Sequence, residues 1–435
     1  MHKIERLLQT LAPKGVEFRK LGEVLEYDQP NKYCVTGKEF DKSYPTPVLT
    51  AGKTFILGYT NEKDNIYQAS KSSPVIIFDD FTAATQWVDF PFKVKSSAMK
   101  ILLPKNSTIN IRFIFFYMQT IPYNISGEHT RQWISRYSQI QIPIPPLEIQ
   151  QEIVKILDAF TELNTELNTE LKARKKQYQY YQNMLLDFKG INSNHKDAKE
   201  KLVQKTYPKR LKSLLQTLAP KGVEFRKLGD MTTSFTKQTG FDYSAFIKPT
   251  LIKEYLPNYI PFIQNKDFLG HYINYKTDYF IPNEIASRFP QTLLNEKCLL
   301  ISISGSIGKV AVFNHSQDAF IGGAIAVLKF KEKKSLDFVM HFLMSASGQK
   351  LLLNSVKSSS HKNLTIADLR NLTIPIPPLE IQQEIVKILD QFSVLTTDLL
   401  AGIPAEIEAR KKQYEYYREK LLSFKPLTPY KEVKK

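Results

Sequence analysis

Apolar residues recur at alternating steps of four and three along two stretches of this 435-residue chain. In the first stretch these residues are Ile149, Ile153, Ile156, Phe160, Leu163 and Leu167. In the second they are Ile381, Ile385, Ile388, Phe392, Leu395 and Leu399. This spacing is typical of a coiled-coil seam, and the proline-rich segment before each stretch favours a helix start. We therefore predict two long helices, the first beginning near Leu147.

The first seam changes step in the tandem sequence TELN-TELN-TEL at 161–171, where an extra step of four predicts a stutter. It resumes through Arg174, Tyr178, Tyr181, Leu185 and Phe188. The second seam continues through Ile403, Ile407, Arg410, Tyr414, Tyr417, Leu421 and Phe424. Gly402 and Pro404 are predicted to kink or interrupt that helix, since proline lacks a backbone donor.

Matching seams in one chain predict that the two helices pack on each other as a rigid, antiparallel, intramolecular coiled coil. The alternative is two separate helices, each packed only on its own globular half. Either arrangement places a whole domain between the helices in sequence.

The chain also repeats itself. LLQTLAPKGVEFRKLG at 7–22 recurs letter for letter at 214–229, and IPIPPLEIQQEIVKILD at 142–158 recurs at 374–390. The segments between these repeats, 23–141 and 230–373, differ in length by 25 residues and show no letter-by-letter match. A repeated frame with different inserts indicates that the frame performs one task twice and the inserts perform different tasks.

The inserts have the patterns of mixed α/β domains. Segments 74–80 and 298–313 are β-rich, whereas 112–120 and 336–348 suit short buried helices. The expected fold class is α+β, with two mixed domains separated by the coiled coil and an internal pseudo-twofold duplication. The expected divisions are domain 1 at 1–141, a central helix at 142–188, a polar linker at 189–210, domain 2 at 211–373, a C-terminal helix at 374–425 and a tail at 426–435.

A formal net charge of +17 favours a polyanionic partner over the simpler alternative of an ordinary basic surface. The charged N-terminus resembles neither a signal nor a transit peptide, and no apolar run approaches membrane-spanning length. The two cysteines, Cys34 and Cys298, lack metal-ligand or disulfide spacing and suit a reducing cytoplasm. We therefore expect a cytoplasmic protein with no membrane partner.

Tests for catalytic motifs are negative. AGKT at 51–54 has Pro47 where a phosphate-binding loop needs glycine, and GSIGK at 305–309 lacks the dinucleotide spacing. The scattered histidines give no metal or acid–base pattern, and Asp79 with Asp80 is best interpreted as a surface turn. We expect no catalytic residue, no metal site and no cofactor on this chain.

Two loops carry the signals of DNA contact. SGEHTRQWIS at 126–135 and SVKSSSHKNLT at 355–365 hold corresponding places before the repeated IPIPP. Arg131 and Lys362 suit phosphates or guanine, and Gln132 and Asn363 suit adenine, although ordinary solvated loops are the alternative. The candidate DNA-binding residues are Lys53, Thr54, His129, Thr130, Arg131, Gln132, Ser304, Ser306, Lys309, His361, Lys362 and Asn363.

The repeated PIPPLEIQQEIVKILD and ARKKQY helices, alternating with dissimilar globular segments, resemble the specificity subunit of type I restriction-modification enzymes over essentially the whole chain. FDDFTAATQWVDFPF and ISISGSIGKV also resemble the target-recognition domains of that family. The resemblance implies that each domain reads one half of an asymmetric site in double-stranded DNA, and that the helices set the gap and dock partners. The frame residues expected in this role are Ile149, Ile153, Ile156, Phe160, Ile381, Ile385, Ile388 and Phe392.

The implied partners are two methyltransferase subunits, which bind S-adenosylmethionine, and restriction subunits, which use ATP and Mg²⁺. Two unlike readers on one chain favour a non-palindromic bipartite site, and a repeated frame suits two copies of one partner. The rival interpretations are a free-standing bipartite DNA-binding regulator and a coiled-coil scaffold without a nucleic-acid role.

Overall fold

The computed structural model describes residues 2–50, 54–122, 131–193, 197–356, 363–397 and 402–427. It divides into two compact units, of which unit 1 comprises Met1–Glu166 with Glu408–Lys435 and unit 2 comprises Leu167–Ile407. The division passes through the long helices, so each unit contains a part of both. Among the described residues, no helix combines the length and apolar character that crossing a membrane requires.

Unit 1 is built on the first copy of the repeated segments. Strand β1 (Glu17–Lys20) pairs antiparallel with β9 (Gln141–Ile144), which joins the two repeated sequences in space. Helix α1 (His2–Leu11) is tied to the start of the long helix by an ion pair of 2.6 Å between Lys3 and Glu152. Helix α5 (Leu147–Leu185) begins at Leu147, as predicted from the prolines before it.

Unit 2 repeats this frame. Strand β10 (Glu224–Lys227) pairs with β21 (Thr373–Ile376) in the same register as β1 with β9. Helix α7 (Lys209–Leu218) takes the place of α1, and Arg210 lies 3.1 Å from Glu384 at the positions equivalent to Lys3 and Glu152. Helix α13 (Leu379–Thr397) begins at the equivalent of Leu147. The predicted internal duplication is confirmed.

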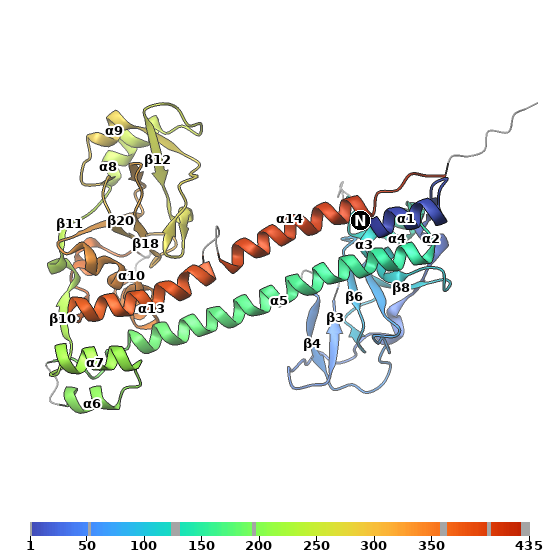
Figure 1. Ribbon diagram of the computed structural model, residues 1–435, viewed down its shortest axis with the longest axis horizontal. Helices are drawn as coiled ribbons and strands as arrows, with labels where there is room; N and C mark the ends of the chain where they lie inside the picture. Colours follow the sequence, from blue (N-terminus) through green and yellow to red (C-terminus); the bar gives the residue numbers. More distant parts are fainter. Residues whose placement is uncertain are drawn as a thin grey trace, which may run out of the picture. The chain divides into compact units, whose positions relative to one another are not determined.

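The two variable segments share a topology that their letters do not reveal (Figure 1). Each holds a four-stranded antiparallel sheet, in the order β2-β8-β5-β6 in unit 1 and β11-β20-β17-β18 in unit 2. Each also holds a second sheet with one parallel pair, β3 with β7 in unit 1 and β12 with β19 in unit 2. Both domains are therefore variants of one α/β fold.

The strands of unit 1 are β2 (Leu25–Asp28), β3 (Thr46–Leu49), β4 (Ile56–Thr60), β5 (Val75–Asp79), β6 (Thr85–Val88), β7 (Lys93–Val94) and β8 (Met99–Pro104). Those of unit 2 are β11 (Thr232–Lys237), β12 (Tyr259–Ile263), β13 (Phe268–Leu269), β14 (Tyr272–Ile273), β15 (Phe280–Pro282), β16 (Leu293–Leu294), β17 (Cys298–Ser302), β18 (Val310–Phe313), β19 (Ala319–Ile321) and β20 (Ile325–Phe330). The β-rich segments predicted at 74–80 and 298–313 are confirmed.

Short helices cover the sheets, and the two predicted from sequence are confirmed as α3 and α10. The helices of unit 1 include α2 (Leu21–Val24), α3 (Ile111–Met118) and α4 (Gln132–Ser135). Those of unit 2 include α6 (Ala198–Gln204), α8 (Gly240–Asp242), α9 (Asn283–Ser287), α10 (Leu336–Met344), α11 (Ala346–Asn354) and α12 (Ile366–Arg370). Helix α6 lies within the segment expected to be a polar linker, and its Leu202 is buried.

The two helical segments pack on each other within each unit, in antiparallel order. In unit 1 the ring of Phe160 stacks on Tyr417 of α14 (Ile403–Leu421), with 5.5 Å between centroids. In unit 2 the ring of Tyr181 stacks on Phe392 of α13, with 4.9 Å between centroids. Partner numbers fall as numbers along α5 rise, so the predicted antiparallel coiled coil is confirmed.

The helices also present a second apolar face to the globular domains. Ile149, Ile153 and Leu157 are fully buried in the core of unit 1, whereas Ile156 and Phe160 are half-buried, and the Phe160 ring packs on α14. Each helix therefore packs on its own domain and on the other helix, so the alternative in which each helix packs only on its own globular half is wrong. The prediction that Leu395 lies in the seam is wrong, because its side chain is 44% exposed.

The second helix is interrupted where glycine and proline predict it. Helix α13 ends at Thr397, and α14 begins at Ile403 with Gly402 just before it and Pro404 in its first turn. Proline suits a first turn because the missing donor has no helical partner there. The first helix, α5, continues without a break through the stutter at 161–171.

In each unit, the segment that follows a long helix is hydrogen-bonded to the residue just before the first frame strand. In unit 1 the amide of Val16 donates to the carbonyl of Lys425 at 2.9 Å, and Leu427 donates to Val16 at 3.0 Å. In unit 2 Val223 donates to Ile191 at 2.7 Å, and Ser193 donates to Val223 at 2.9 Å. The same bond pattern thus joins equivalent segments in both copies.

Candidate nucleic-acid interface

Two of the predicted DNA-contacting segments meet in unit 2. The turn that follows β17 forms an isolated antiparallel bridge between Ser304 and Asn363, in the segment leading to β21. The amide of Leu364 completes it by donating to the carbonyl of Ile303 at 3.0 Å. Ser304 and Asn363, which are 59 residues apart in the printed sequence, therefore form one surface.

A third segment joins this surface, which sequence reasoning missed. The side-chain amide of Asn265, just after β12, donates to the carbonyl of Ser304 at 2.6 Å. The ammonium of Lys309 donates to the carbonyl of Asn265 at 2.9 Å. These bonds place Asn265, Ser304, Lys309 and Asn363 together, and we call them the unit 2 loop cluster.

The turn within this cluster is held rigidly. The buried hydroxyl of Ser302 donates to the carbonyl of Ser306 and accepts from the amide of Lys309 at 2.9 Å. Gly305 and Gly308 supply the positive φ values of 70° and 86° that the turn requires. Ser306 and Lys309 are consequently exposed on a fixed backbone, a suitable arrangement for contacting a phosphate or a base edge.

Unit 1 has the same arrangement with different side chains. The amide of Gln132 donates to the carbonyl of Asp80 at 2.8 Å, at positions equivalent to Leu364 and Ile303. The amide of Trp133 donates to the carboxylate of Asp80 at 2.9 Å, and Arg131 lies exposed beside it. We call Asp80, Arg131 and Gln132 the unit 1 loop cluster.

The two carboxylates expected on a surface turn are buried, so that part of the interpretation is wrong. Asp79 does shape the turn, accepting from the amides of Phe81 and Thr82 at 2.9 and 3.2 Å. Asp80 is 1% exposed, and its carboxylate lies 3.6 Å from the ammonium of Lys100. Burial lowers the pKa of Lys100, with a smaller contribution in the same direction from the charge of Arg131.

Of the remaining predicted DNA-binding residues, the structure describes only some. Thr54 is exposed in the connection between β3 and β4, which corresponds in topology to the segment that carries Asn265. Gln132 is half-buried at the start of α4. Outside the described residues lie Lys53, His129, Thr130, His361 and Lys362.

The constant frame holds each variable domain through the same carboxylate position. In unit 1 Asp158 of α5 pairs with Arg112 of α3 at 2.7 Å, and the guanidinium also lies 4.4 Å from the centre of the Trp87 ring. In unit 2 the equivalent Asp390 of α13 pairs instead with His341 of α10 at 2.8 Å. The frame thus supplies an aspartate at the same position in both units, and each variable domain supplies a different partner, the Arg112 guanidinium in unit 1 and the His341 ring in unit 2.

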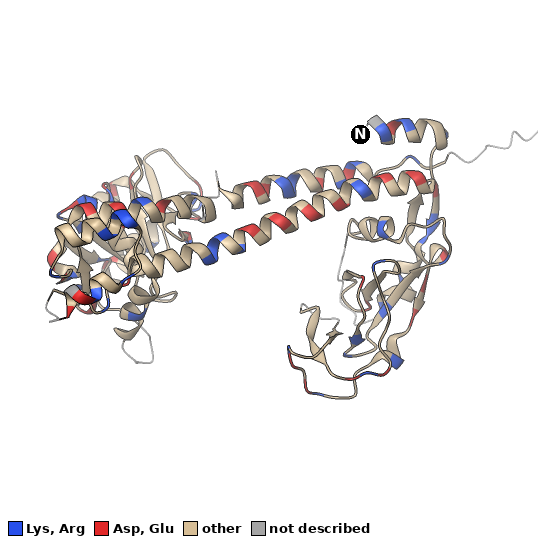
Figure 2. Cartoon of the chain, turned by 60° about the horizontal axis from the view of Figure 1, so that its bottom comes forward, with Lys and Arg blue, Asp and Glu red and all other residues tan. Residues whose placement is uncertain are grey.

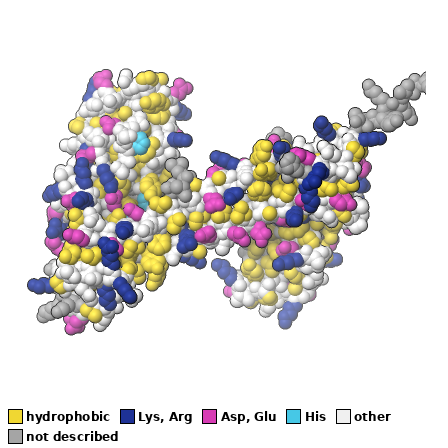
Figure 3. Space-filling model, in the orientation of Figure 1, with side chains coloured by type: hydrophobic (Ala, Val, Ile, Leu, Met, Phe, Trp, Pro, Cys, Tyr) yellow, Lys and Arg dark blue, Asp and Glu magenta, His cyan; other side chains and the backbone are white. Residues whose placement is uncertain are grey.

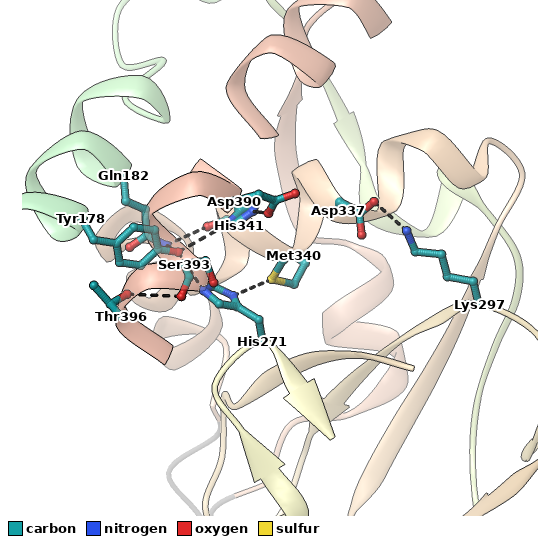
Figure 4. A network of polar contacts seen from close by, with 10 residues as sticks. All are labelled: Tyr178, Gln182, His271, Lys297, Asp337, Met340, His341, Asp390, Ser393 and Thr396. Atoms are coloured by element: carbon teal, nitrogen blue, oxygen red, sulfur yellow. Dashed lines mark hydrogen bonds and ion pairs between the residues drawn. The ribbon is translucent and has the colours of Figure 1, made fainter. Parts of the chain in front are cut away.

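The Asp390 contact in unit 2 extends into a buried polar network (Figure 4). The hydroxyl of Tyr178 lies 2.9 Å from Nε2 of His271 and 3.4 Å from Nδ1 of His341. Gln182, one turn along α5, donates to that hydroxyl at 3.3 Å. The network connects α5 and α13 of the frame to the β13–β14 hairpin of the domain, so it fixes the orientation of the domain on its own helices.

The buried network predicts a pH-dependent stability. Burial, together with the neighbouring His341, lowers the pKa of His271 to about 3, so this ring is neutral in the folded protein. An unfolded chain takes up a proton below about pH 6.5, which favours unfolding as the pH falls. Between pH 7.5 and 5.0 we expect His271 to cost unit 2 about 2 kcal/mol of unfolding free energy.

Urea unfolding at the two pH values measures this effect in the wild type and in His271→Gln, which cannot titrate. The variant is expected to lose about 2 kcal/mol less than the wild type over the interval. His315→Gln, at an exposed histidine of the same unit, is the matched control and keeps the wild-type loss. Equal losses in wild type and His271→Gln contradict the prediction.

The charges along the frame are mixed. Figure 2 shows acidic and basic residues following one another along α5, so this helix does not form a uniformly basic surface. The acidic residues lie in its first part, from Glu148 to Glu170, and the basic ones, apart from Lys155, lie between Lys172 and Lys176. The positive net charge of the chain therefore has to be sought mainly outside the first part of α5.

Comparisons with known proteins agree on one family. The family model described as type I restriction modification DNA specificity domain matches residues 13–177 and 220–409. The EcoR124I/EcoR124II specificity subunit of a type I restriction enzyme from Escherichia coli is 37% identical, over 98% of each chain. A putative type I restriction enzyme specificity subunit from Haemophilus influenzae is 29% identical, over 85% of each chain.

A solved structure shares the fold. The S subunit of a type I restriction-modification system from M. genitalium aligns with a TM-score of 0.57, over 94% of this chain and 96% of that one. Its sequence identity is 13%, so the likeness concerns the fold alone.

Proposed function

Because the chain belongs to the type I restriction-modification DNA specificity family, we propose that it gives a cytoplasmic enzyme of this type its target sequence, with each unit reading one half of a bipartite, asymmetric DNA site. The observation that carries the proposal is the pair of loop clusters. Equivalent backbone bonds, Gln132 to Asp80 and Leu364 to Ile303, present different side chains in the two units. Like backbones with unlike side chains suit the reading of two different half-sites.

The proposed DNA contacts are the twelve residues identified from the sequence, and we propose Asn265 as a residue that positions two of them. Arg131 and Lys309 are exposed cations, suited to phosphates or to the O6 and N7 of guanine. Asn363 is exposed beside Ser304, where its amide suits the N6 and N7 of adenine. Asn265 acts indirectly by positioning Ser304 and Lys309.

The chain is proposed to recognise DNA without catalysing a reaction. Two methyltransferase subunits bring S-adenosylmethionine, and restriction subunits bring ATP and Mg²⁺, so this chain itself holds no cofactor. The long helices set the gap between the half-sites and contribute to docking the methyltransferase subunits. Phe160 and Phe392 stack across the helix pair, and Ile149, Ile153, Ile381 and Ile385 are buried in the cores of the two units. Ile156 and Ile388 are proposed to take part with them.

A free-standing bipartite regulator is the second candidate. Two different reading domains on one chain suit a regulator equally well. A regulator that binds DNA alone, however, would not need the repeated segments to be identical at their exposed positions. It should bind its site tightly without help, whereas a specificity subunit should need, or be strongly helped by, the methyltransferase.

Methylation-site sequencing tests the proposal. DNA from cells that express this chain with its methyltransferase partner is compared with DNA from cells that lack this chain. We expect a split, asymmetric methylated motif that disappears without the chain. An unchanged methylation pattern rejects the proposal, and binding of the same split site by the purified chain alone, unaffected by the methyltransferase, favours the regulator.

A further inference from the structure

Each unit carries a groove between the repeated segments of its frame. The groove of unit 1 has a volume of about 580 Å³ and runs between the end of α1 and the segment that leads into α5. The groove of unit 2 has a volume of about 560 Å³ and runs between the end of α7 and the segment that leads into α13. The two cavities therefore occupy the same place in the two copies of the frame.

Their walls are the same residues. Gly15, Glu17, Arg19 and the run Ile144–Leu147 in unit 1 correspond letter for letter to Gly222, Glu224, Arg226 and Ile376–Leu379 in unit 2. Other lining residues differ: Thr108 and Leu427 line only the groove of unit 1, whereas variable-domain residues such as Asp230, Phe330 and Lys331 line only the groove of unit 2.

Folding alone does not demand this identity. The variable domains keep a common topology with no letter-by-letter match, so the fold tolerates extensive change. The identity in the grooves includes exposed positions, where substitutions rarely alter stability by more than about 0.5 kcal/mol. Repeated exposed letters at a repeated cavity indicate that both grooves meet the same chemistry.

Each groove also has an exposed apolar anchor at its edge. Leu11 is 42% exposed and its equivalent Leu218 is 40% exposed, and each lines its groove. The space-filling view shows that exposed hydrophobic side chains occur on both units (Figure 3). An exposed leucine beside a proline-walled cavity favours contact with an apolar side chain of another segment.

A charged pair stands at the rim of each groove. In unit 2 the Arg226 guanidinium lies 2.7 Å from Glu224 and lowers the pKa of that carboxyl, and in unit 1 Arg19 lies 4.0 Å from Glu17. Each groove is therefore lined by one acid and one base, which pair with each other, and by apolar residues such as Ile144 in unit 1 and Ile376 in unit 2. This combination suits an amphipathic segment with an apolar side chain flanked by groups of opposite charge.

The tail of this chain is not a suitable common occupant. Leu427 lines the groove of unit 1, but no residue from the end of the chain lines the groove of unit 2 among the described residues. A single partner molecule cannot fill both grooves with one segment either, unless it is itself duplicated. Two grooves with the same walls are best filled by two copies of one partner.

We propose that the two grooves are equivalent docking sites, each holding the same amphipathic segment of one methyltransferase subunit. This inference rests on the proposed function and adds to it a surface distinct from the coiled-coil seam. Each site stands on the frame and not on the recognition loops, so one partner surface serves two unlike domains.

Counting partners on single-site variants tests the proposal. Full-length chain is mixed with purified methyltransferase subunit, and the assemblies are weighed by native mass spectrometry. The wild type is expected to carry two subunits. Leu11→Asp and Leu218→Asp are each expected to carry one, since a buried carboxylate at the anchor weakens its site about 100-fold. The double variant is expected to carry none at the same concentrations.

Val203→Asp is the matched control, since Val203 is 54% exposed in α6 and lies outside both grooves. This control should still bind two methyltransferase subunits. Thermal unfolding should show that all variants are folded. If an aspartate variant is unfolded, Arg19→Glu and Arg226→Glu replace the aspartate pair in the same experiment. Two subunits on the double variant overturn the groove proposal alone. A wild-type chain that binds no subunit rejects the proposed function with it, and a mass showing a second copy of this chain overturns the choice of partner.

Discussion

Deleting Thr165–Asn168 is expected to shorten the gap between the two recognised half-sites by about one to two base pairs. Four helical residues span roughly 6 Å at 1.5 Å each, against a base-pair rise of about 3.4 Å. The four residues lie in the continuous part of α5 where the chain passes from unit 1 to unit 2, between Glu166 and Leu167. Neither loop cluster is touched, so both half-sites should keep their sequences.

Methylation-site sequencing in cells measures the gap directly. The matched control has unchanged length: Thr165→Ala, Glu166→Ala and Asn168→Ala combined should leave the gap as it is. An unchanged gap in a folded, active deletion variant contradicts the idea that α5 acts as a ruler.

Removing one exposed cation from each loop cluster is expected to weaken one half-site only. Lys309→Ala should reduce binding about 10- to 100-fold and relax specificity in the half-site read by unit 2, since a good base contact contributes about 1–3 kcal/mol. Arg131→Ala should have the same effect on the half-site read by unit 1. The two effects should add, because the residues belong to different units.

Competition binding with the methyltransferase complex measures this, using duplexes in which one half-site or the other is scrambled. Lys227→Ala removes an exposed cation from the frame strand β10 and is the control for charge alone. A loss that is equal for all duplexes identifies a phosphate contact, whereas a loss confined to one half-site identifies a base contact. No loss for Lys309→Ala removes this residue from the proposed interface.

Much of the frame could be predicted from the sequence because its signals are local. The prolines before Leu147 and the periodic apolar residues after it place the start of α5, and Gly402 with Pro404 place the interruption of the second helix. The common topology of the variable domains could not be predicted. Many different apolar residues can fill a sheet core, so two sequences without matching letters, such as β5 and β17, reach the same place in one fold.

The seam was predicted only in part for a related reason. A heptad pattern assumes one partner face, but α5 packs on both a helix and a domain, so Leu157 is buried more deeply than Ile156. Leu395 fits the heptad pattern but is exposed. The spacing of apolar residues does not show whether a partner covers each of them, so this exposure could not be predicted.

The recognition surface was found in outline from the sequence and completed by the fold. The loops before each IPIPP repeat gave Arg131 and Asn363 because cations and amides interleave there. Asn265 gave no such signal, since its role depends on bonds to Ser304 and Lys309 across 39 and 44 residues. The burial of Asp80 was equally hidden, since a neighbouring pair of aspartates is typical of exposed turns.

Because equivalent hydrogen bonds close the frame in both units, we expect a chain with the two domains in the opposite order to fold as well. Val16 meets Lys425 and Leu427 as Val223 meets Ile191 and Ser193, yet only the second pair is joined by a short stretch of chain. Hydrogen bonds alone therefore join Val16 to the segment around Lys425, whereas the equivalent segments of unit 2 are also close neighbours along the chain. Exchange of either variable segment by recombination between the repeated sequences therefore yields a protein with a new half-site and the same frame, so that new specificities can arise by shuffling instead of by successive point mutations.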